Sequence, residues 1–90
     1  MKIGIIGLGL IGGSLALSIR KNTRHTVLGC DIDPATMLRA KAVEAIDEAL
    51  TAEELSQCDI VLVVLYPDQC VEYIRTHADA FKPNALVIDC

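Results

Sequence analysis

The chain has no tryptophan, only one phenylalanine and only two tyrosines among its 90 residues, so aromatic side chains cannot dominate its core. Hydrophobic residues nonetheless make up 52% of the sequence, and most of them are aliphatic. A core of Ile, Leu, Val and Ala suits a parallel sheet under helices, because such strands are buried on both faces. Ninety residues allow one domain at most.

The sequence also lacks a basic run and a long apolar segment. Its formal net charge is −4, which disfavours nucleic acid and anionic membrane surfaces as partners. The longest apolar stretch, 60–66, is far shorter than the roughly 20 residues that a membrane-spanning helix needs. The apolar segment after Lys2 is too short for a secretory signal. We therefore expect a cytoplasmic protein that binds neither nucleic acid nor membrane.

Closely spaced cysteines are missing as well. The four cysteines lie far apart, at Cys30, Cys58, Cys70 and Cys90. A zinc site needs clustered ligands, so we predict no metal site. The spacing favours reduced, mostly buried thiols, with Cys70 partly exposed near the start of a helix.

Strand and helix patterns alternate along the chain. We predict strands over 2–6, 26–30, 46–50, 59–65 and 85–89, and helices over 10–21, 34–45, 52–57 and 67–81. Asp33 before Pro34 is a typical helix start, and Thr51 opens a capping box. The last helix is expected to bury one face, formed by Val71, Ile74, Ala78 and Phe81.

A glycine-rich turn joins the first predicted strand to the first predicted helix. It has the pattern G-x-G-x-x-G and consists of Gly7, Leu8, Gly9, Leu10, Ile11 and Gly12. In such turns the first glycine permits the sharp bend, the second lets a pyrophosphate approach the backbone, and the third allows close helix packing. The free N–H groups of Leu10 and Ile11 and the helix dipole would attract phosphates. We predict that all six residues bind a dinucleotide.

Asp31 lies nineteen residues after Gly12, at the end of the second predicted strand. A carboxylate there accepts hydrogen bonds from the adenosine ribose hydroxyls and repels a 2′-phosphate. No Lys or Arg follows directly, so we predict NAD as the cofactor in preference to NADP.

Alternating strands and helices of these lengths predict an α/β fold, a Rossmann-type doubly wound parallel sheet with strand order 3-2-1-4-5. The ligand crevice would lie at the carboxyl ends of the first and fourth strands. The last strand would be an exposed apolar edge. We therefore expect residues 1–90 to be a truncated dinucleotide-binding domain that lacks its substrate and dimerisation domain.

The loop that follows the fourth predicted strand should lie over the ribose and nicotinamide side of the crevice. It contains Leu65, Tyr66 and Pro67, which we predict to contact the cofactor. Tyr66 either covers the cofactor or keeps its hydroxyl in water. His25 and His77 are expected at the surface, away from the strand carboxyl ends, so no catalytic acid or base is identified.

Residues 7–16 closely resemble the opening of the prephenate/arogenate dehydrogenases, with Gly13-Ser14 after the glycine motif as the distinctive part. Further similar segments are 29–34, 45–49, 58–62 and 85–89, so the resemblance covers essentially the whole chain. One departure concerns Leu65 and Tyr66, which are bulky where the family has a small residue and proline. Pro67 accordingly follows one position late.

This resemblance implies a parent enzyme of tyrosine biosynthesis, an NAD-dependent dehydrogenase that acts on prephenate. It would oxidatively decarboxylate prephenate to 4-hydroxyphenylpyruvate, as a homodimer, with substrate held by a helical C-terminal domain. Only Gly7, Gly9, Gly12 and Asp31 match the family's functional positions, so the 90 residues alone are expected to be inactive. Two alternatives are a regulatory NAD(H)-sensing module without catalysis and a dehydrogenase of a small 3-hydroxy acid.

Overall fold

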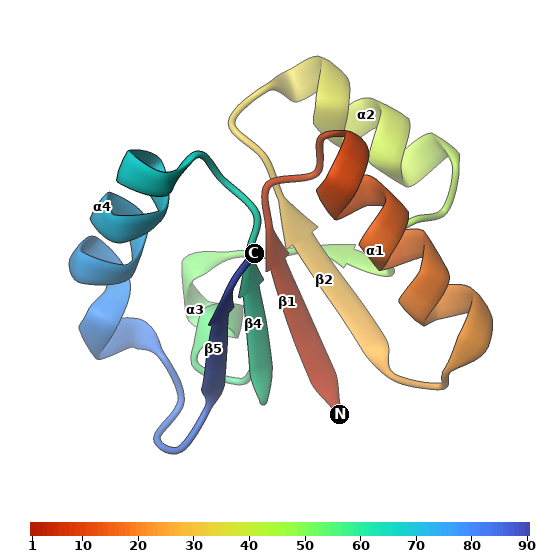
Figure 1. Cartoon of the computed structure of the whole chain (residues 1–90). Helices are drawn as coiled ribbons and strands as arrows, with labels where there is room; N and C mark the ends of the chain where they lie inside the picture. The colour runs from red at the N-terminus through yellow and green to blue at the C-terminus, as the bar shows by residue number, and fades with distance from the viewer.

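The computed structural model describes all residues, 1–90, as alternating strands and helices (Figure 1). The strands are β1 (Lys2–Ile6), β2 (Thr26–Cys30), β3 (Glu48–Ala49), β4 (Ile60–Val63) and β5 (Leu86–Asp89). The helices are α1 (Leu10–Asn22), α2 (Pro34–Ala42), α3 (Ala52–Leu55) and α4 (Pro67–His77), followed by the 3-10 turn η1 (Ala78–Ala80). No helix is both long and apolar enough to cross a membrane.

The five strands form one parallel sheet in the order β3-β2-β1-β4-β5, which confirms the predicted Rossmann-type topology. Backbone hydrogen bonds continue just beyond the strand ends. The Gly7 N–H donates to the Cys30 carbonyl at 2.9 Å, and the Val64 N–H donates to the Ile6 carbonyl at 2.7 Å. The carboxyl ends of β1, β2 and β4 therefore lie side by side, where the chain leaves each strand for a loop.

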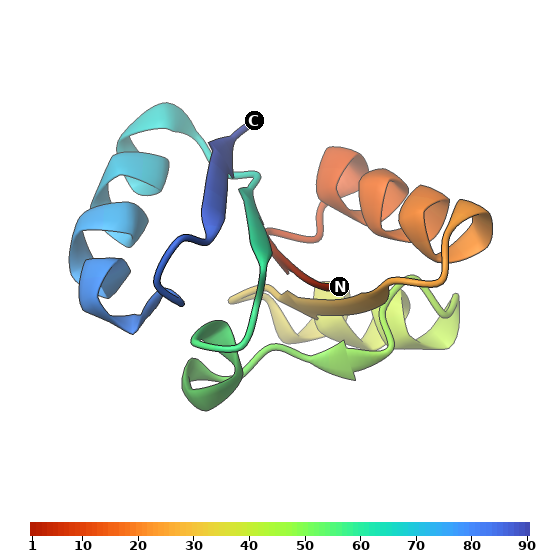
Figure 2. The same ribbon diagram turned by 90° about the horizontal axis from the view of Figure 1, so that it is seen from below.

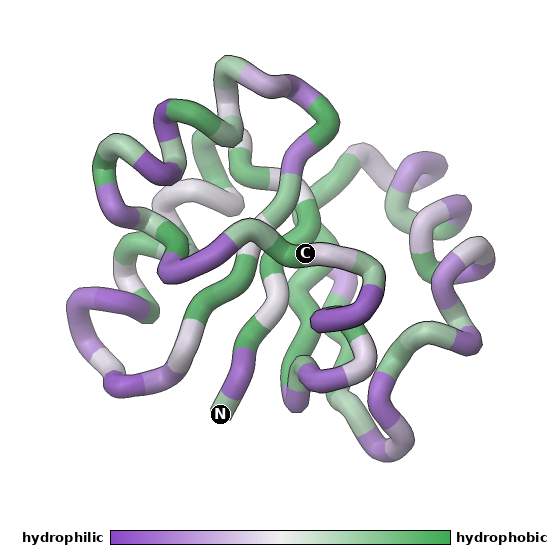
Figure 3. The backbone as a smooth tube through the Cα atoms, turned by 180° about the vertical axis from the view of Figure 1, so that it is seen from behind, coloured by the Kyte–Doolittle hydropathy of each residue, from purple (hydrophilic) through white to green (hydrophobic).

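Helices lie on both faces of the sheet (Figure 2), and on each face an apolar cluster packs between the sheet and its helices. Successive strand residues point to opposite faces, so Ile5 packs with α1 and α2 while Ile6 packs with α3 and α4. Figure 3 shows the same arrangement, with hydrophobic segments along the strands and hydrophilic segments on the outer helices and loops. The sheet is thus buried from both sides near its centre, as an aliphatic composition favours.

Helix α2 ends at Ala42, three residues before the predicted end. Glu44 has φ +58° there, the Glu44 N–H donates to the Lys41 carbonyl, and the Ala45 N–H donates to the Ala40 carbonyl. These two hydrogen bonds form a Schellman motif, which stops a helix with one left-handed residue. Sequence patterns did not indicate it, because the left-handed residue is glutamate and not glycine.

Helix α4 also differs from expectation, because its buried face is rotated from the predicted one. Val71 is 54% exposed and Ala78 is exposed, whereas Cys70 is fully buried against β4 and β5. The prediction of a partly exposed Cys70 was therefore wrong, and the helix packs through Cys70, Tyr73 and Ile74.

Strand β5 pairs with β4 alone, so its outer edge is open, as the sequence suggested. Leu86 is 56% exposed and Ile88 is 38% exposed on this strand. Of the other cysteines, Cys58 is buried, Cys30 is half-buried and Cys90 is exposed just after β5. No disulfide forms.

Candidate functional site

The glycine-rich turn is held in a shape that only glycine tolerates at two positions. Gly7 has φ +95°, and a Cβ there would lie 2.2 Å from the Val64 carbonyl oxygen. A Cβ on Gly12 would lie 1.8 Å from the Gly7 carbonyl oxygen. Both distances are far inside van der Waals contact. Gly7 therefore makes the bend after β1, and Gly12 lets α1 approach the strand closely.

Gly9 differs from these two glycines, because a Cβ at Gly9 would meet no protein atom within 4 Å. Gly9 is exposed and is the N-cap residue of α1. The fold itself does not require a glycine here. The space in front of Gly9 is open, and a missing side chain leaves the backbone accessible to a ligand.

The start of α1 is uncapped and carries no acidic residue in its first turn. The first N–H groups of a helix, here those of Leu10 and Ile11, have no acceptor within the helix. The side chains of Leu10 and Ile11 are 84% and 66% exposed. Free N–H groups and the positive end of the helix dipole both favour a negatively charged group at such a position.

Asp31 follows β2 directly and is fixed by the turn that precedes α1. Its Oδ2 accepts the Leu8 N–H at 2.8 Å, and its Oδ1 accepts the Asp33 N–H at 2.9 Å. Each oxygen keeps lone-pair capacity for a further hydrogen bond. The carboxylate is therefore oriented by two backbone donors and can still accept bonds from hydroxyl groups.

Leu8 has its N–H committed to Asp31 and its side chain fully buried. A Cβ on Gly29 would lie 3.0 Å from both terminal methyl groups of Leu8, so this side chain fills the space above β2. Leu8 thus positions the turn and Asp31, and its contact with a cofactor stays a prediction.

A groove of about 570 Å³ opens beside the turn, between the strand ends and α4. Its first wall is formed by residues at or just after the ends of β1, β2 and β4, namely Ile6, Gly7, Cys30, Asp31, Ile32 and Leu65. Its second wall is formed by one face of α4, namely Asp68, Gln69, Glu72, Tyr73, Thr76 and His77. Lysine and arginine are absent from this lining.

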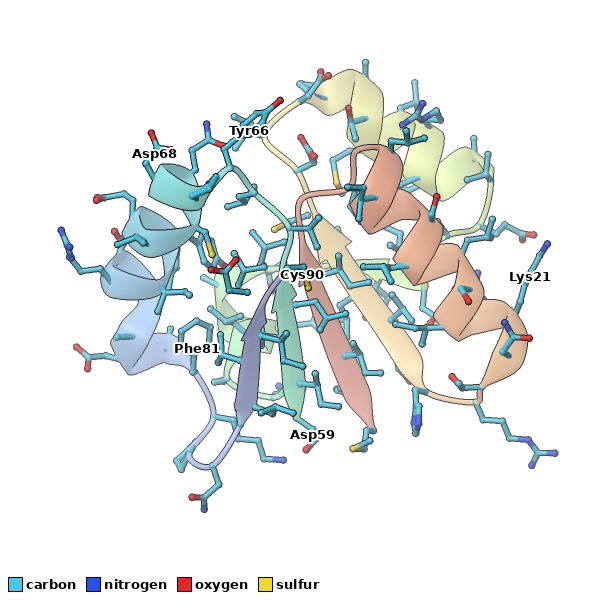
Figure 4. All side chains as sticks on the ribbon, viewed as in Figure 1. Lys21, Asp59, Tyr66, Asp68, Phe81 and Cys90 are labelled. Carbon is cyan, nitrogen blue, oxygen red and sulfur yellow. The ribbon has the colours of Figure 1, made fainter.

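The structure brings three of the predicted site residues, Gly7, Asp31 and Leu65, together in this groove. Tyr66 and Pro67 lie outside its lining, and Tyr66 is 77% exposed. Figure 4 shows Tyr66 at the carboxyl edge of the sheet, on the loop that leads to α4. Their expected contact with the nicotinamide side of a cofactor stays a prediction.

The α4 wall was not predicted from the sequence. Its six residues lie at positions 68, 69, 72, 73, 76 and 77, which is the spacing of one helical face. That spacing was visible in the sequence, but the face is largely polar, and only the apolar face of this helix was assigned a role. His77 was expected at the surface, away from the strand ends. Instead it is half-buried in the groove wall.

His77 is held against Tyr73 on this wall. The two rings stack with centroids 4.0 Å apart at 20° between their planes, and His77 Nδ1 lies 2.9 Å from the Tyr73 carbonyl oxygen. Burial raises the pKa of Tyr73 to about 12, so its hydroxyl stays protonated at neutral pH. The pair offers the groove a flat, rigid surface.

Cys30 is the one thiol in the groove. Burial, and after it the neighbouring Asp31 charge, raises the pKa of Cys30 to about 11. Burial likewise raises the pKa of the Cys70 thiol. Since the thiolate is the nucleophilic form, neither cysteine is set up for covalent chemistry at neutral pH. No group of His, Cys, Asp and Glu side chains is arranged to hold a metal ion.

Comparison with known proteins assigns the chain to a family. The family model described as the nucleotide-binding domain of prephenate dehydrogenase matches residues 15–90. The match begins at Leu15, after the glycine-rich turn, so the turn is an independent observation.

Solved structures agree with this family. Arogenate dehydrogenase from Synechocystis is 30% identical with a TM-score of 0.90, over 99% of this chain and 32% of that chain. Prephenate dehydrogenase from A. aeolicus, in complex with hydroxyphenyl propionate and NAD+, is 25% identical with a TM-score of 0.87 over the same shares.

A curated protein, L-threonate dehydrogenase from Cupriavidus necator, is 33% identical over 91 residues, covering 97% of this chain and 30% of that protein. The chain therefore spans about a third of the length of these relatives, which are dehydrogenases. Because the family model matches most of its residues, the chain belongs to the family of prephenate dehydrogenase nucleotide-binding domains.

Proposed function

We propose that this chain binds NAD across the glycine-rich turn and the groove, as the nucleotide-binding domain of a dehydrogenase that oxidises prephenate. The observation that carries the proposal is the open space at Gly9 beside the uncapped start of α1. A diphosphate needs that combination of free N–H groups and close backbone approach.

The residues present fit the parts of a dinucleotide. Gly9, Leu10 and Ile11 would hold the diphosphate through their backbone. Asp31 would accept hydrogen bonds from the adenosine ribose. The groove beyond Asp31 has apolar surface from Ile32 and Leu65, which suits a heterocyclic base.

The charge of the groove favours NAD over NADP. Asp31, Asp68 and Glu72 line it, and no lysine or arginine does. A 2′-phosphate on the ribose would add close to two negative charges beside the Asp31 carboxylate without a cation to pair them.

Bound NAD would supply a hydride acceptor for the oxidation of a substrate alcohol. The residues of this chain would bind and orient it, and none of them is assigned an acid or base role. We propose that substrate-binding and catalytic groups, and the homodimer contact, come from a further domain. The chain by itself is then expected to bind NAD and to turn over no substrate.

Isothermal titration with NAD and NADP tests this proposal. Wild type should bind NAD at least about tenfold more tightly than NADP, a difference of about 1.4 kcal/mol. Asp31→Asn should weaken NAD binding and reduce the difference between the affinities for NAD and NADP. Asp79→Asn, which alters an exposed carboxylate outside the groove, should leave both affinities unchanged. Equal affinities of wild type for the two cofactors would show that Asp31 does not discriminate.

A second candidate, a dehydrogenase of a small hydroxy acid, is favoured by the 33% identity to L-threonate dehydrogenase. A regulatory NAD-sensing module would share the same site without any turnover. An assay of NADH formation with prephenate, arogenate and L-threonate, in the longer protein that our proposal requires, separates these three candidate functions. We expect formation with prephenate, and formation with L-threonate alone would favour the second candidate.

A further inference from the structure

A second hollow, of about 580 Å³, lies at the amino edge of the sheet, opposite the glycine-rich turn. We call it the amino-edge hollow. The residues that line it include Met1, Lys2, Arg24, Gln57, Asp59 and Lys82. Figure 4 shows Asp59 at this edge, where β4 begins, far from the loop that carries Tyr66.

The amino-edge hollow is lined by more positively charged side chains than negatively charged ones. Three of the chain's eight lysines and arginines line it, against a single carboxylate, Asp59. Asp59 Oδ1 pairs with the Lys82 ammonium, and Oδ2 accepts the Lys2 backbone N–H at 2.9 Å. The single negative charge of Asp59 offsets that of Lys82, so the Lys2 and Arg24 side chains are left without a counter-charge in the hollow.

Lys2 and Arg24 have no acidic partner in the structure. The Lys2 Nζ donates to the neutral Gln57 Oε1 at 2.7 Å, which fixes the ammonium without cancelling its charge. The only ion pairs in the chain are Arg20–Asp47 and Lys82–Asp59, so the Arg24 guanidinium is unpaired. Two uncompensated side-chain cations thus face one hollow, beside the Met1 ammonium that also lines it, in a chain whose net charge is −4.

Independently of the proposed cofactor, we propose that the amino-edge hollow binds one small oxyanion of the phosphate class, with Arg24 and Lys2 as its main partners. Guanidinium groups match phosphate oxygens with two parallel hydrogen bonds, and an ammonium adds a point charge. Two free positive charges balance one dianion. They are too few for a polyanion such as nucleic acid or a membrane surface.

An NMR titration of the 15N-labelled chain with inorganic phosphate, at ionic strength held constant with KCl, tests the proposal. The Arg24 Nε–H signal and the amides around Gln57 should shift saturably, and saturating NAD should not abolish these shifts. Arg24→Gln and Lys2→Gln should each weaken the apparent affinity about tenfold. Arg75→Gln, an exposed arginine on α4 outside the hollow, should bind phosphate like wild type.

Three results would overturn this proposal. Shifts that appear in a separate titration with KCl, and not with phosphate at constant ionic strength, would indicate general screening. Shifts confined to residues 9–12 would place phosphate on the glycine-rich turn alone. Unchanged affinity in Arg24→Gln, with the remaining spectrum intact, would show that the unpaired guanidinium binds nothing.

Discussion

Gly9 and Gly12 lie three residues apart in one turn, yet an added methyl group should have opposite consequences at the two positions. At Gly12 the methyl would collide with the Gly7 carbonyl, whereas at Gly9 it would enter open space. The collision at Gly12 is with a backbone carbonyl, which cannot move aside as a flexible side chain can. The two substitutions therefore separate the needs of the fold from the needs of a ligand.

Gly12→Ala should lower the free energy of unfolding by about 1–3 kcal/mol or more, because the helix must move away from β1. Gly9→Ala should change it by less than about 1 kcal/mol and still reduce NAD affinity at least about tenfold. Urea denaturation and isothermal titration of both variants measure these effects. If Gly9→Ala bound NAD as tightly as wild type, the backbone at Gly9 would not touch the diphosphate.

Asp59 joins three strands at the amino edge of the sheet. Its carboxylate contacts the Lys2 N–H and the Lys82 ammonium, and its backbone pairs with Lys2 and Leu86. Hydrogen bonding from Lys82, and then from the Lys2 backbone, holds the pKa of Asp59 below its usual range. A depressed carboxyl pKa contributes stability that is complete above the unfolded value of about 3.9 and is lost as pH falls through the folded value.

The melting temperature of Asp59→Asn should therefore lie below that of wild type at pH 7, and the difference should shrink as the pH falls below about 4. Circular dichroism melts at pH 7 and pH 3 measure this difference. Asp79→Asn serves as the control, because Asp79 is exposed and has no ion-pair partner. If the difference in melting temperature between Asp59→Asn and wild type stayed constant from pH 7 to pH 3, the ionised form of Asp59 would contribute nothing to stability.

The end of α2 offers a test at the scale of one element. Glu44 occupies the left-handed position of a Schellman motif, where an L side chain costs roughly 1–2 kcal/mol relative to the right-handed region. Glu44→Gly should therefore raise the free energy of unfolding by about 1 kcal/mol. Glu44→Ala, which keeps a Cβ, should give no such gain. A glycine variant no more stable than the alanine variant would contradict the left-handed assignment.

The same helix end shows what sequence patterns could and could not predict. The start of α2 was predicted, because Asp33 caps it as expected, with Oδ1 accepting the Ala35 N–H at 3.1 Å. Its end was not, because left-handed termination by glutamate depends on hydrogen bonds with Ala40 and Lys41 that leave no compositional mark. Boundaries set by backbone hydrogen bonds are thus harder to predict than those set by capping side chains.

At the scale of the whole molecule, the strand order was predicted because alternating elements of these lengths permit few right-handed arrangements. The sharp bend at the glycine-rich turn and the place of Asp31 at the end of β2 were predicted because both depend on a local motif. The second wall of the groove was not, because Tyr73 and His77 reach it only through the packing of α4 against the sheet. That packing depends on Cys70 facing inward, which the spacing of apolar residues on α4 did not indicate.

The most direct test of the central claim, that the start of α1 binds the diphosphate of NAD, is a 15N NMR titration of the chain with NAD. We predict large, saturable shifts of the Gly9, Leu10 and Ile11 amides, together with shifts in Ile32 and the α4 wall of the groove. Saturable shifts elsewhere with these amides unmoved, or no shifts at all in a folded protein, would contradict the account.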